Sequence, residues 1–391
     1  MKPLKPIIFS FILTLIPLMA TAQETIPSDS STYVSATLSS ETDTLPPKIS
    51  RWRKFINKME YLLRDFNRID RDYITPQKYN YVFMMQGTHN YERYTLRSNS
   101  GQTFTFAPKP SVKVGPYLGW RWIFFGYQID VSTLKGDLKN EFDLSIYSSL
   151  VGIDIFSRHN KSGYRIKSAY KGKEDYTPML GNMDFSGIEV GIRGFNLYYI
   201  FNHKKFSYPA AFSQSTMQKR SAGSALMGIG YTHHHILLNH HRLRSLVAER
   251  TDNKVVVDSS FNFNEVNYTD AAISGGYAYN YAFAPHWLFA ASLSVALGYK
   301  SSKAEVDKDI FRFPFRGFKF QNINIDGVGR FALVWNNMRW FAGTSAILHT
   351  YNYNKKKFST NSTFGSFNIY VGLNFGDRHP ERKRKNKKQS S

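Results

Sequence analysis

Large apolar side chains alternate with smaller ones along the stretch from Trp287 to Tyr299. The large series begins and ends with an aromatic residue, and nearly all the positions between its members hold Ala, Ser or Gly. A repeat of two is the period of a β-strand whose two faces differ. A large apolar face opposite a small, weakly polar face is typical of a strand between lipid and a barrel lumen.

The same alternation recurs along most of the chain. It is clear around Tyr277–Phe283 and again in Phe367–Phe375, where the series ends on an aromatic residue, as the last strand of an outer-membrane barrel typically does. The pattern predicts strands near residues 91–107 (one long or two short), 111–120, 122–131, 141–156, 164–170, 185–201, 223–233, 268–283, 287–300, 323–335, 339–353 and 363–375.

The connections between these strands differ in length. Ala284–His286 and Asn336–Met338 are predicted to be tight turns, whereas residues 234–266 and 303–321 are predicted to be long loops. Short turns on one side and long loops on the other are typical of an outer-membrane barrel. We therefore predict an all-β fold, a transmembrane antiparallel β-barrel of about 12 strands (roughly 10 to 14) over residues 79–376. A barrel of this size has a narrow lumen that side chains can fill.

Two other folds have to be weighed. A soluble periplasmic β-sandwich would also consist of alternating strands, although it would not need the asymmetry of loops. Residues 271–299 contain no Lys, Arg, Asp or Glu, which is also a property of a transmembrane helix. Gly275, Gly276 and Pro285 interrupt that segment, and its period of two favours a hairpin.

The two ends of the chain have a different composition. Residues 1–22 have the basic start, apolar core and Ala20–Ala22 cleavage motif of an export signal. Residues 23–48 are predicted to be a disordered lead-in, and residues 49–70 an amphipathic helix near the periplasmic mouth. Residues 377–391 form a basic tail. Both termini of an even-stranded barrel are expected in the periplasm, which gives a Gram-negative outer-membrane location.

Charge and cysteine content narrow the partners. The chain has no cysteine, so neither disulfides nor a lipoprotein anchor is expected. Its formal net charge of +22 suggests anionic partners, namely outer-membrane lipid or lipopolysaccharide, although much of this charge is expected to be solvated loop and tail. Export argues against nucleic acid. The barrel assembly machinery is the other expected partner, and no cofactor is predicted.

Several segments resemble a known family. They are Asp72–Pro76 with Tyr79, Gly115–Trp122, Phe125–Tyr127, Glu141–Ser145, Tyr199–Asn202, Phe206–Phe212 and Lys219–Ser224. Together they are similar to the exported family of Bacteroidota called domain of unknown function 4421, over residues 67–376. The resemblance implies an outer-membrane setting and a single barrel-like domain, and it implies no activity or catalytic residue.

The segment Asn202–Ser221 is long for its position. Counting strands places it on the periplasmic side, where turns are normally short, so it is expected to fold into the lumen or cap the mouth. An error in the count would make it an ordinary external loop. Gln218, Lys219 and Arg220 are candidate contacts to a polar or anionic solute at a constriction. Charged residues within strands, Asp143, Asp154, Glu189 and Arg193, are expected to face the lumen, where they could pair with one another or line a polar pore.

Two further chemistries were considered. His233 and His235 would project from one face of a strand and, with His240, are weak candidates for a metal site. Ser215, Ser221 or Ser224 beside a histidine could serve an envelope-lipid hydrolase or acyltransferase, but no spacing makes that specific. Phosphate-binding, dinucleotide and zinc-protease motifs are absent from the sequence. The leading expectation is an envelope protein that is structural or that passes or binds a small solute or lipid.

Overall fold

The computed structural model describes residues 69–120, 123–131, 140–161, 163–302, 322–354 and 358–377. The predicted export signal, lead-in and long loop 303–321 lie outside these residues, as do nearly all of the predicted amphipathic helix and of the basic tail. The chain divides into two units, Met1–Ile69 and Asp70–Ser391, and every element discussed below belongs to the second unit.

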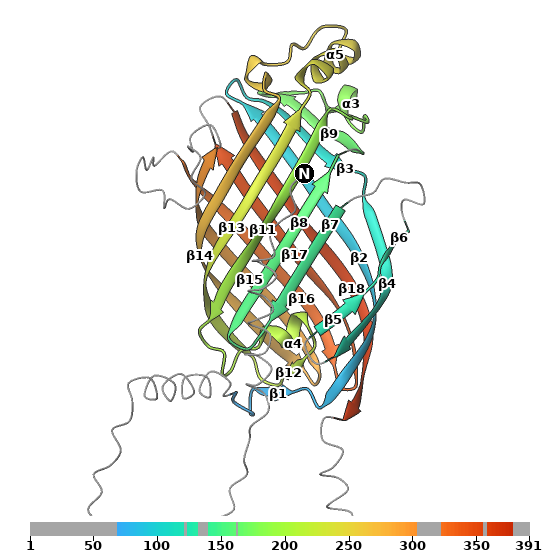
Figure 1. The fold of residues 1–391 in the computed structure, drawn as a ribbon, viewed down its shortest axis with the longest axis vertical. Coiled ribbons are helices and arrows are strands. Elements are labelled where there is room, and N and C mark those ends of the chain that lie inside the picture. The colour runs from blue at the N-terminus through green and yellow to red at the C-terminus, as the bar shows by residue number, and fades with distance from the viewer. Residues whose placement is uncertain are drawn as a thin grey trace, which may run out of the picture. The chain divides into compact units, whose positions relative to one another are not determined.

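An antiparallel sheet of sixteen strands makes up most of this unit, and it curls around on itself (Figure 1). Its strands are β2 (Tyr79–Ser98), β3 (Gln102–Pro108), β4 (Ser111–Trp120), β5 (Ile123–Gly126), β6 (Ile129–Asp130), β7 (Asn140–Tyr147), β8 (Val151–Asn160), β9 (Tyr164–Lys171), β10 (Glu174–Asp175), β11 (Ile188–Ile200), β13 (Ala222–Leu238), β14 (Glu265–Ala284), β15 (Trp287–Ser302), β16 (Ile323–Asn336), β17 (Trp340–Asn354) and β18 (Phe358–Asp377). Strands β1 (Ile74–Pro76) and β12 (Thr216–Gln218) pair with each other in a separate two-stranded sheet.

Sixteen named strands exceed the predicted number because some positions in the wall hold two short strands in line. Strands β3 and β4 both pair with β2, one with the half near Ser98 and the other with the half near Tyr79. Strands β5 and β6 likewise both pair with β4. Around the rest of the wall each strand pairs with its neighbours in the order β2-β18-β17-β16-β15-β14-β13-β11-β8-β7. Among the described residues no strand pairing joins β7 to β5 or β6, so the ladder is not closed there.

The predicted alternation along β15 is confirmed. Trp287, Phe289, Leu293, Val295 and Leu297 are exposed, whereas Leu288, Ala290, Ser292 and Gly298 are buried. The neighbouring strands align these outward residues in rows: Leu297 stands between Ile273 of β14 and Ile325 of β16, and Phe289 between Tyr281 and Leu333. The segment 271–299 is therefore a β-hairpin, and the helix considered as an alternative is wrong.

Short turns lie at one end of the sheet, which we call the short-turn end. Trp287 pairs with Ala284 across the turn between β14 and β15. In the turn between β16 and β17, the side-chain oxygen of Asn337 accepts from the backbone N–H groups of Arg339 and Trp340, at 3.1 and 2.7 Å, which is how asparagine stabilises a tight turn. Both turns stand where the sequence predicts them.

One hairpin was missed. Residues 141–156 were predicted as a single strand, whereas β7 and β8 form a hairpin closed by Ser148. The Ser148 backbone N–H donates to the Val151 carbonyl at 2.9 Å, and its hydroxyl accepts from the Val151 N–H at 2.9 Å. A serine turn of this kind carries neither Gly nor Pro, the two strongest turn signals.

The opposite end of the sheet, which we call the loop end, carries the longer connections. Helices α3 (Thr177–Leu180) and α5 (His240–Arg250) and the short 3₁₀ helix η1 (Ser259–Phe261) lie there, whereas α4 (Tyr208–Phe212) lies at the short-turn end (Figure 1). The predicted loop 234–266 therefore has ordered structure of its own, and β13 runs on to Leu238 before it begins. No described helix is long and apolar enough to cross a membrane.

The interior of the sheet is packed. A large cluster of buried aromatic and aliphatic side chains, the loop-end cluster, includes Tyr94, Phe104, Phe106, Phe156, Tyr268, Tyr351 and Phe364. Two smaller clusters involve the segment that carries α4; one contains Tyr198, Phe206 and Tyr208, and the other Ala210, Ala211, Leu288 and Val334. The inward faces of the strands thus enclose side chains, as predicted for a narrow lumen.

Candidate functional site

The connection between β11 and β13 folds into the mouth of the sheet at its short-turn end. This segment, residues 201–221, which we call the plug, carries α4 and β12. Helix α4 contacts β7, β15 and β16, and these strands lie in different parts of the wall. The plug therefore crosses the mouth at the short-turn end of the sheet, as expected for a segment that caps the mouth.

Buried hydrogen bonds hold the plug to the wall. The Tyr208 and Ser292 hydroxyl oxygens are 2.5 Å apart, and the Gln214 amide donates to the Tyr370 hydroxyl at 2.9 Å. The Asn280 amide donates to the Ser207 carbonyl at 2.8 Å. Since buried polar groups that lose their partners cost about 1–3 kcal/mol each, these contacts fix the position of the plug as well as adding stability.

The three predicted contact residues of this segment have different environments. Gln218 is buried, and its side-chain amide donates to the carbonyls of Lys205 and Arg220, at 2.6 and 2.8 Å. Lys219 and Arg220 are exposed. The Arg220 guanidinium carbon lies 5.8 Å from the ring centre of Tyr73. Gln218 thus holds the plug together from within, whereas the two cations face away from the buried interior and do not form a constriction.

The expectation that Glu189 and Arg193 face the lumen is wrong. Their neighbours on β11, Ile188, Val190 and Ile192, are buried, so the odd-numbered positions face outward. The Glu189 carboxylate lies 3.1 Å from Nε2 of His159, which also faces outward. Glu189 and Arg193 stand on the part of β11 nearest the loop end. Charged side chains on the outer face have a small free-energy cost there, because that part of the strand lies beyond the apolar band.

Asp143 and Asp154 do face inward and belong to ion pairs that span the interior. The Asp154 carboxylate of β8 binds the Arg330 guanidinium of β16, and both groups are buried. Arg158 of β8 binds Glu92 of β2 at 3.1 Å and Asp143 of β7 at 2.7 Å. The pairs to Arg330 and Glu92 tie separate parts of the wall together through the lumen, whereas the pair to Asp143 joins the neighbouring strands β7 and β8.

A third group of charges lies at the loop end of the interior. The Lys300 ammonium is 2.8 Å from an Asp326 oxygen and 3.5 Å from an Asp270 oxygen, and it donates to the Asn352 carbonyl at 2.6 Å. Sequence reasoning did not single out Lys300, Asp326 or Arg330. The only available signal was a charged residue at the inward parity of a predicted strand.

The histidine candidates do not assemble into a metal site. His233 and His235 project from one face of β13, as predicted, but His240 stands on α5, where its ring packs on His241 at 4.1 Å between centroids. His235 Nδ1 lies 2.6 Å from the side-chain oxygen of Asn267. Within the described residues no group of three His, Cys, Asp or Glu side chains could hold a metal ion.

The candidate serines also have partners other than histidine. The Ser215 hydroxyl lies 3.2 Å from that of Ser213, and the Ser221 hydroxyl accepts from the Ala282 N–H at 3.0 Å. The Ser224 hydroxyl donates to the Ala225 carbonyl at 2.8 Å. In the part of the chain that the structure describes, none of these contacts forms the serine–histidine pair that a hydrolase of that type requires.

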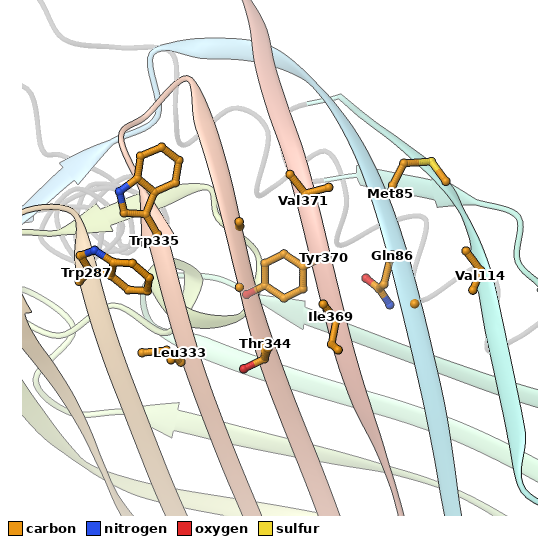
Figure 2. A pocket seen from close by; sticks show the side chains of 13 residues that line it. Met85, Gln86, Val114, Trp287, Leu333, Trp335, Thr344, Ile369, Tyr370 and Val371 are labelled. Carbon is orange, nitrogen blue, oxygen red and sulfur yellow. The ribbon is translucent and has the colours of Figure 1, made fainter.

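The wall carries an apolar groove on its outer face, near the short-turn end (Figure 2). Its volume is about 500 Å³. Its lining comes from β15, β16, β17, β18, β2 and β4 and includes Trp287, Leu333, Trp335, Ile369, Val371, Met85 and Val114. Figure 2 shows the two tryptophans close together and Val114 on the opposite side.

Small side chains on β17 account for this groove. Ala342 pairs with Trp335 on one side and Val371 on the other, and Thr344 pairs with Leu333 and Ile369. A row of small residues between two rows of large ones leaves a depression that follows the strand. The alternation predicted that the large side chains lining this groove face outward. The depth of the groove depends on the cross-strand register, which cannot be read from the sequence.

The chain is similar, at low identity, to several solved structures. The toluene transporter TodX of P. putida is 8% identical, over 76% of this chain and 91% of that one, with a TM-score of 0.21. OprG of Pseudomonas aeruginosa is 9% identical, over 77% and 98%, with a TM-score of 0.23, and OmpT of Vibrio cholerae 9%, over 76% and 98%, with a TM-score of 0.25. Likeness at this level carries no argument about function. Comparison with curated proteins gives no match.

A family model also matches most of the chain. The model of the family described as domain of unknown function (DUF4421) matches residues 68–375, which agrees with the segments singled out in the sequence. The matched range includes the whole sheet up to Phe375, the plug and the loop-end helices. The chain belongs to the DUF4421 family.

Proposed function

We propose that the protein is an outer-membrane β-barrel with a closed interior, a structural protein of the envelope that binds membrane lipid at its outer wall. The single observation that carries this proposal is the division between the two faces of the sheet. Outward positions bear large apolar side chains in continuous rows, while inward positions bear packed aromatic residues, ion pairs and the plug.

The outer face supports the membrane location. Rows such as Ile273, Leu297 and Ile325 run across neighbouring strands, and exposed aromatic residues, Trp287, Trp340 and Phe375 among them, stand near the short-turn end. Soluble proteins rarely expose contiguous apolar patches beyond a few hundred Å². An apolar band flanked by aromatic residues is the outer surface that a transmembrane barrel presents to lipid. By this proposal the short-turn end, with the plug, faces the periplasm.

The packed interior supports a structural or lipid-binding role over that of a pore. Open diffusion needs a lumen wider than its own side chains, and here the plug and the loop-end cluster fill it at two levels. The outer groove near Trp287 and Trp335 can bind a lipid acyl chain, because its lining is almost wholly apolar.

Current through a planar bilayer tests the closed interior. With purified protein inserted, as confirmed by flotation of matched vesicles, we expect no steady current above that of the bare membrane. A stepwise ohmic conductance that scales with inserted protein would overturn the proposal.

A second candidate function is passage of a small polar solute into the interior beside β7. The observation that favours it is the edge of β7 that pairs with no strand of the described residues, where the inward-facing Asp143 and Ser145 are exposed although their partners Arg158 and Asp154 are buried. A solute could approach the internal charges at that edge. Swelling of protein-loaded liposomes in sugars and amino acids, with no current in the bilayer, would favour this candidate over a purely structural role.

A further inference from the structure

We propose that the outer wall carries a binding site for the phosphate headgroup of a membrane lipid, centred on Arg193 and His233 near the loop end. This site rests on the proposed function, since it requires the wall to face lipid. It lies on β8, β11, β13 and β14, away from the apolar groove described above.

Cross-strand register places the site at the border between apolar and polar rows. One outward row consists of Ile155, Phe195, Tyr231 and Ala271, and the next row toward the loop end consists of Ser157, Arg193, His233 and Thr269. The rings of Phe195 and Tyr231 are both exposed, with centroids 6.4 Å apart. Aromatic residues of this kind mark the level of the lipid headgroups in a transmembrane barrel. The polar row therefore stands where lipid phosphates lie.

Charge complementarity identifies the occupant. Arg193 and His233 are directly opposite each other on neighbouring strands, and side chains in that relation are close enough to interact. The Arg193 guanidinium is a cation and a histidine ring N–H can donate a hydrogen bond, so an anion is a ligand that suits both side chains. Among the described residues no carboxylate forms an ion pair with Arg193, whereas His159 and His235 of the next row have Glu189 and Asn267 as partners. The Arg193 guanidinium can therefore bind an external anion.

The neighbouring groups suit a phosphate. The hydroxyl of Ser157 stands on one side of Arg193, and that of Thr269 stands beyond His233. A guanidinium can donate two parallel hydrogen bonds to phosphate, and a hydroxyl can add another. In the next outward row toward the loop end, Gly191 lies between His159 and His235, and the His159 ring fills the space that a Cβ would take.

The element that follows adds positive charge at the same end. Helix α5 begins two residues after β13 ends, and it bears Arg242, Arg244 and Arg250 against the single acid Glu249. Clusters of basic residues beside a membrane surface attract anionic lipid. The helix would draw anionic headgroups toward the loop end, and Arg193 and His233 would hold one of them.

Native mass spectrometry of the full chain in detergent tests the site. The probes are phosphatidic acid, phosphatidylcholine and inorganic phosphate, and the variants are Arg193→Gln and the control Arg93→Gln, an exposed outward arginine of β2 whose guanidinium carbon is 5.9 Å from the ring centre of its neighbour Tyr91. We expect Arg193→Gln to weaken phosphatidic acid binding about tenfold, and Arg93→Gln less than about twofold. His233→Gln should weaken it by an intermediate factor.

Three outcomes would overturn the site. They are equal losses in the two arginine variants, equal binding of phosphatidic acid and phosphatidylcholine, and inorganic phosphate binding as tightly as the lipid, which would make the ligand a free anion. Heat-modifiable mobility on gels verifies that each variant is folded. A folded, membrane-inserted, non-conducting protein that fails these binding tests would remove the headgroup site and leave the proposed function standing.

Discussion

At the scale of single residues, the buried charges are paired between strands, and the Asp154–Arg330 and Arg158–Glu92 pairs cross the lumen. Asp154 and Arg330 are 176 positions apart in the chain, and Arg158 joins β8 to β2 through Glu92. The desolvation free energy of two buried charges offsets most of their electrostatic attraction, so such ion pairs add little net stability. Loss of one partner is different, because it leaves a buried charge uncompensated.

Asp154→Ala is therefore expected to lower the free energy of unfolding by about 3–5 kcal/mol. The double variant Asp154→Leu with Arg330→Met removes both charges and should cost much less than the single change. Asp143→Ala is the matched control, because that carboxylate is 43% exposed and its loss should cost no more than about 1 kcal/mol. Urea unfolding in lipid vesicles, followed by tryptophan fluorescence, measures all three. A double variant at least as unstable as Asp154→Ala would contradict the account.

The alternation of residues along the strands predicted the orientation of some charged side chains but not of others. It placed Asp143 and Asp154 in the lumen, because a strand has two faces and one of them meets lipid. The same reasoning failed for Glu189 and Arg193, because alternation does not say where along a strand the apolar band ends. It also could not find Arg330 or Lys300 as partners, since the pairing of Arg330 depends on which strands face each other across the lumen and that of Lys300 on the register between neighbouring strands.

At the scale of elements, two segments depart from a plain meander of strands. The plug fills the short-turn end, and the loop that carries α5 and η1 packs on the loop end through Val255, Val257 and Phe261. Strand counting predicted that the plug lies at the short-turn end, although two errors had to cancel. The missed hairpin at Ser148 adds one pass along the wall, but β8 and β9 run in the same direction and so remove one.

Replacement of residues 202–221 by a short glycine-containing turn tests the two-level closure. The variant should be less stable, because Tyr208, Ala210 and Ala211 lose their buried contacts, but it should still conduct no current. The aromatic side chains of the loop-end cluster remain in place and block the lumen. Planar bilayer recordings beside the unaltered chain provide the measurement. An open channel produced by this replacement alone would show that the plug is the only barrier.

The loop at the other end predicts a dependence on acid. The Ser100 hydroxyl donates to the Asp258 carboxylate and, with the Ser260 N–H, lowers the pKa of that carboxyl to about 2. The ordinary pKa of aspartate is about 3.9, so the contribution of this contact is complete above about pH 4 and is lost as the pH falls through about 2. Ser100→Ala should shift the loss toward pH 4. Hydrogen exchange of residues 254–262 across this range reports it; identical protection in both proteins at every pH would exclude the contact as the cause.

At the scale of the whole molecule, the sheet separates two environments that a soluble sandwich would not have. Its outer surface is apolar in rows, whereas its interior combines buried ion pairs with a packed cluster of aromatic and aliphatic side chains. The fold class and the outward residues of β15 followed from the sequence, because a period of two is local. The closure of the lumen did not, because it depends on side chains that meet from distant strands and from the plug.

Because the natural chain lacks cysteine, single cysteines report on one position at a time, and a scan along β15 tests the central claim most directly. Leu293→Cys, Val295→Cys and Leu297→Cys represent the outer face, Ala290→Cys and Ser292→Cys the interior, and His286→Cys the exposed turn. In reconstituted vesicles made permeable to small solutes, a charged, water-soluble thiol reagent and a lipid-soluble maleimide are applied to each variant. We expect only His286→Cys to react with the charged reagent. The outer positions should react with the lipid-soluble maleimide. The interior positions should react with neither reagent until the protein is unfolded in urea. Reaction of the interior positions with the charged reagent would reveal a water-filled lumen, and its reaction with the outer positions would mean that the wall does not face lipid.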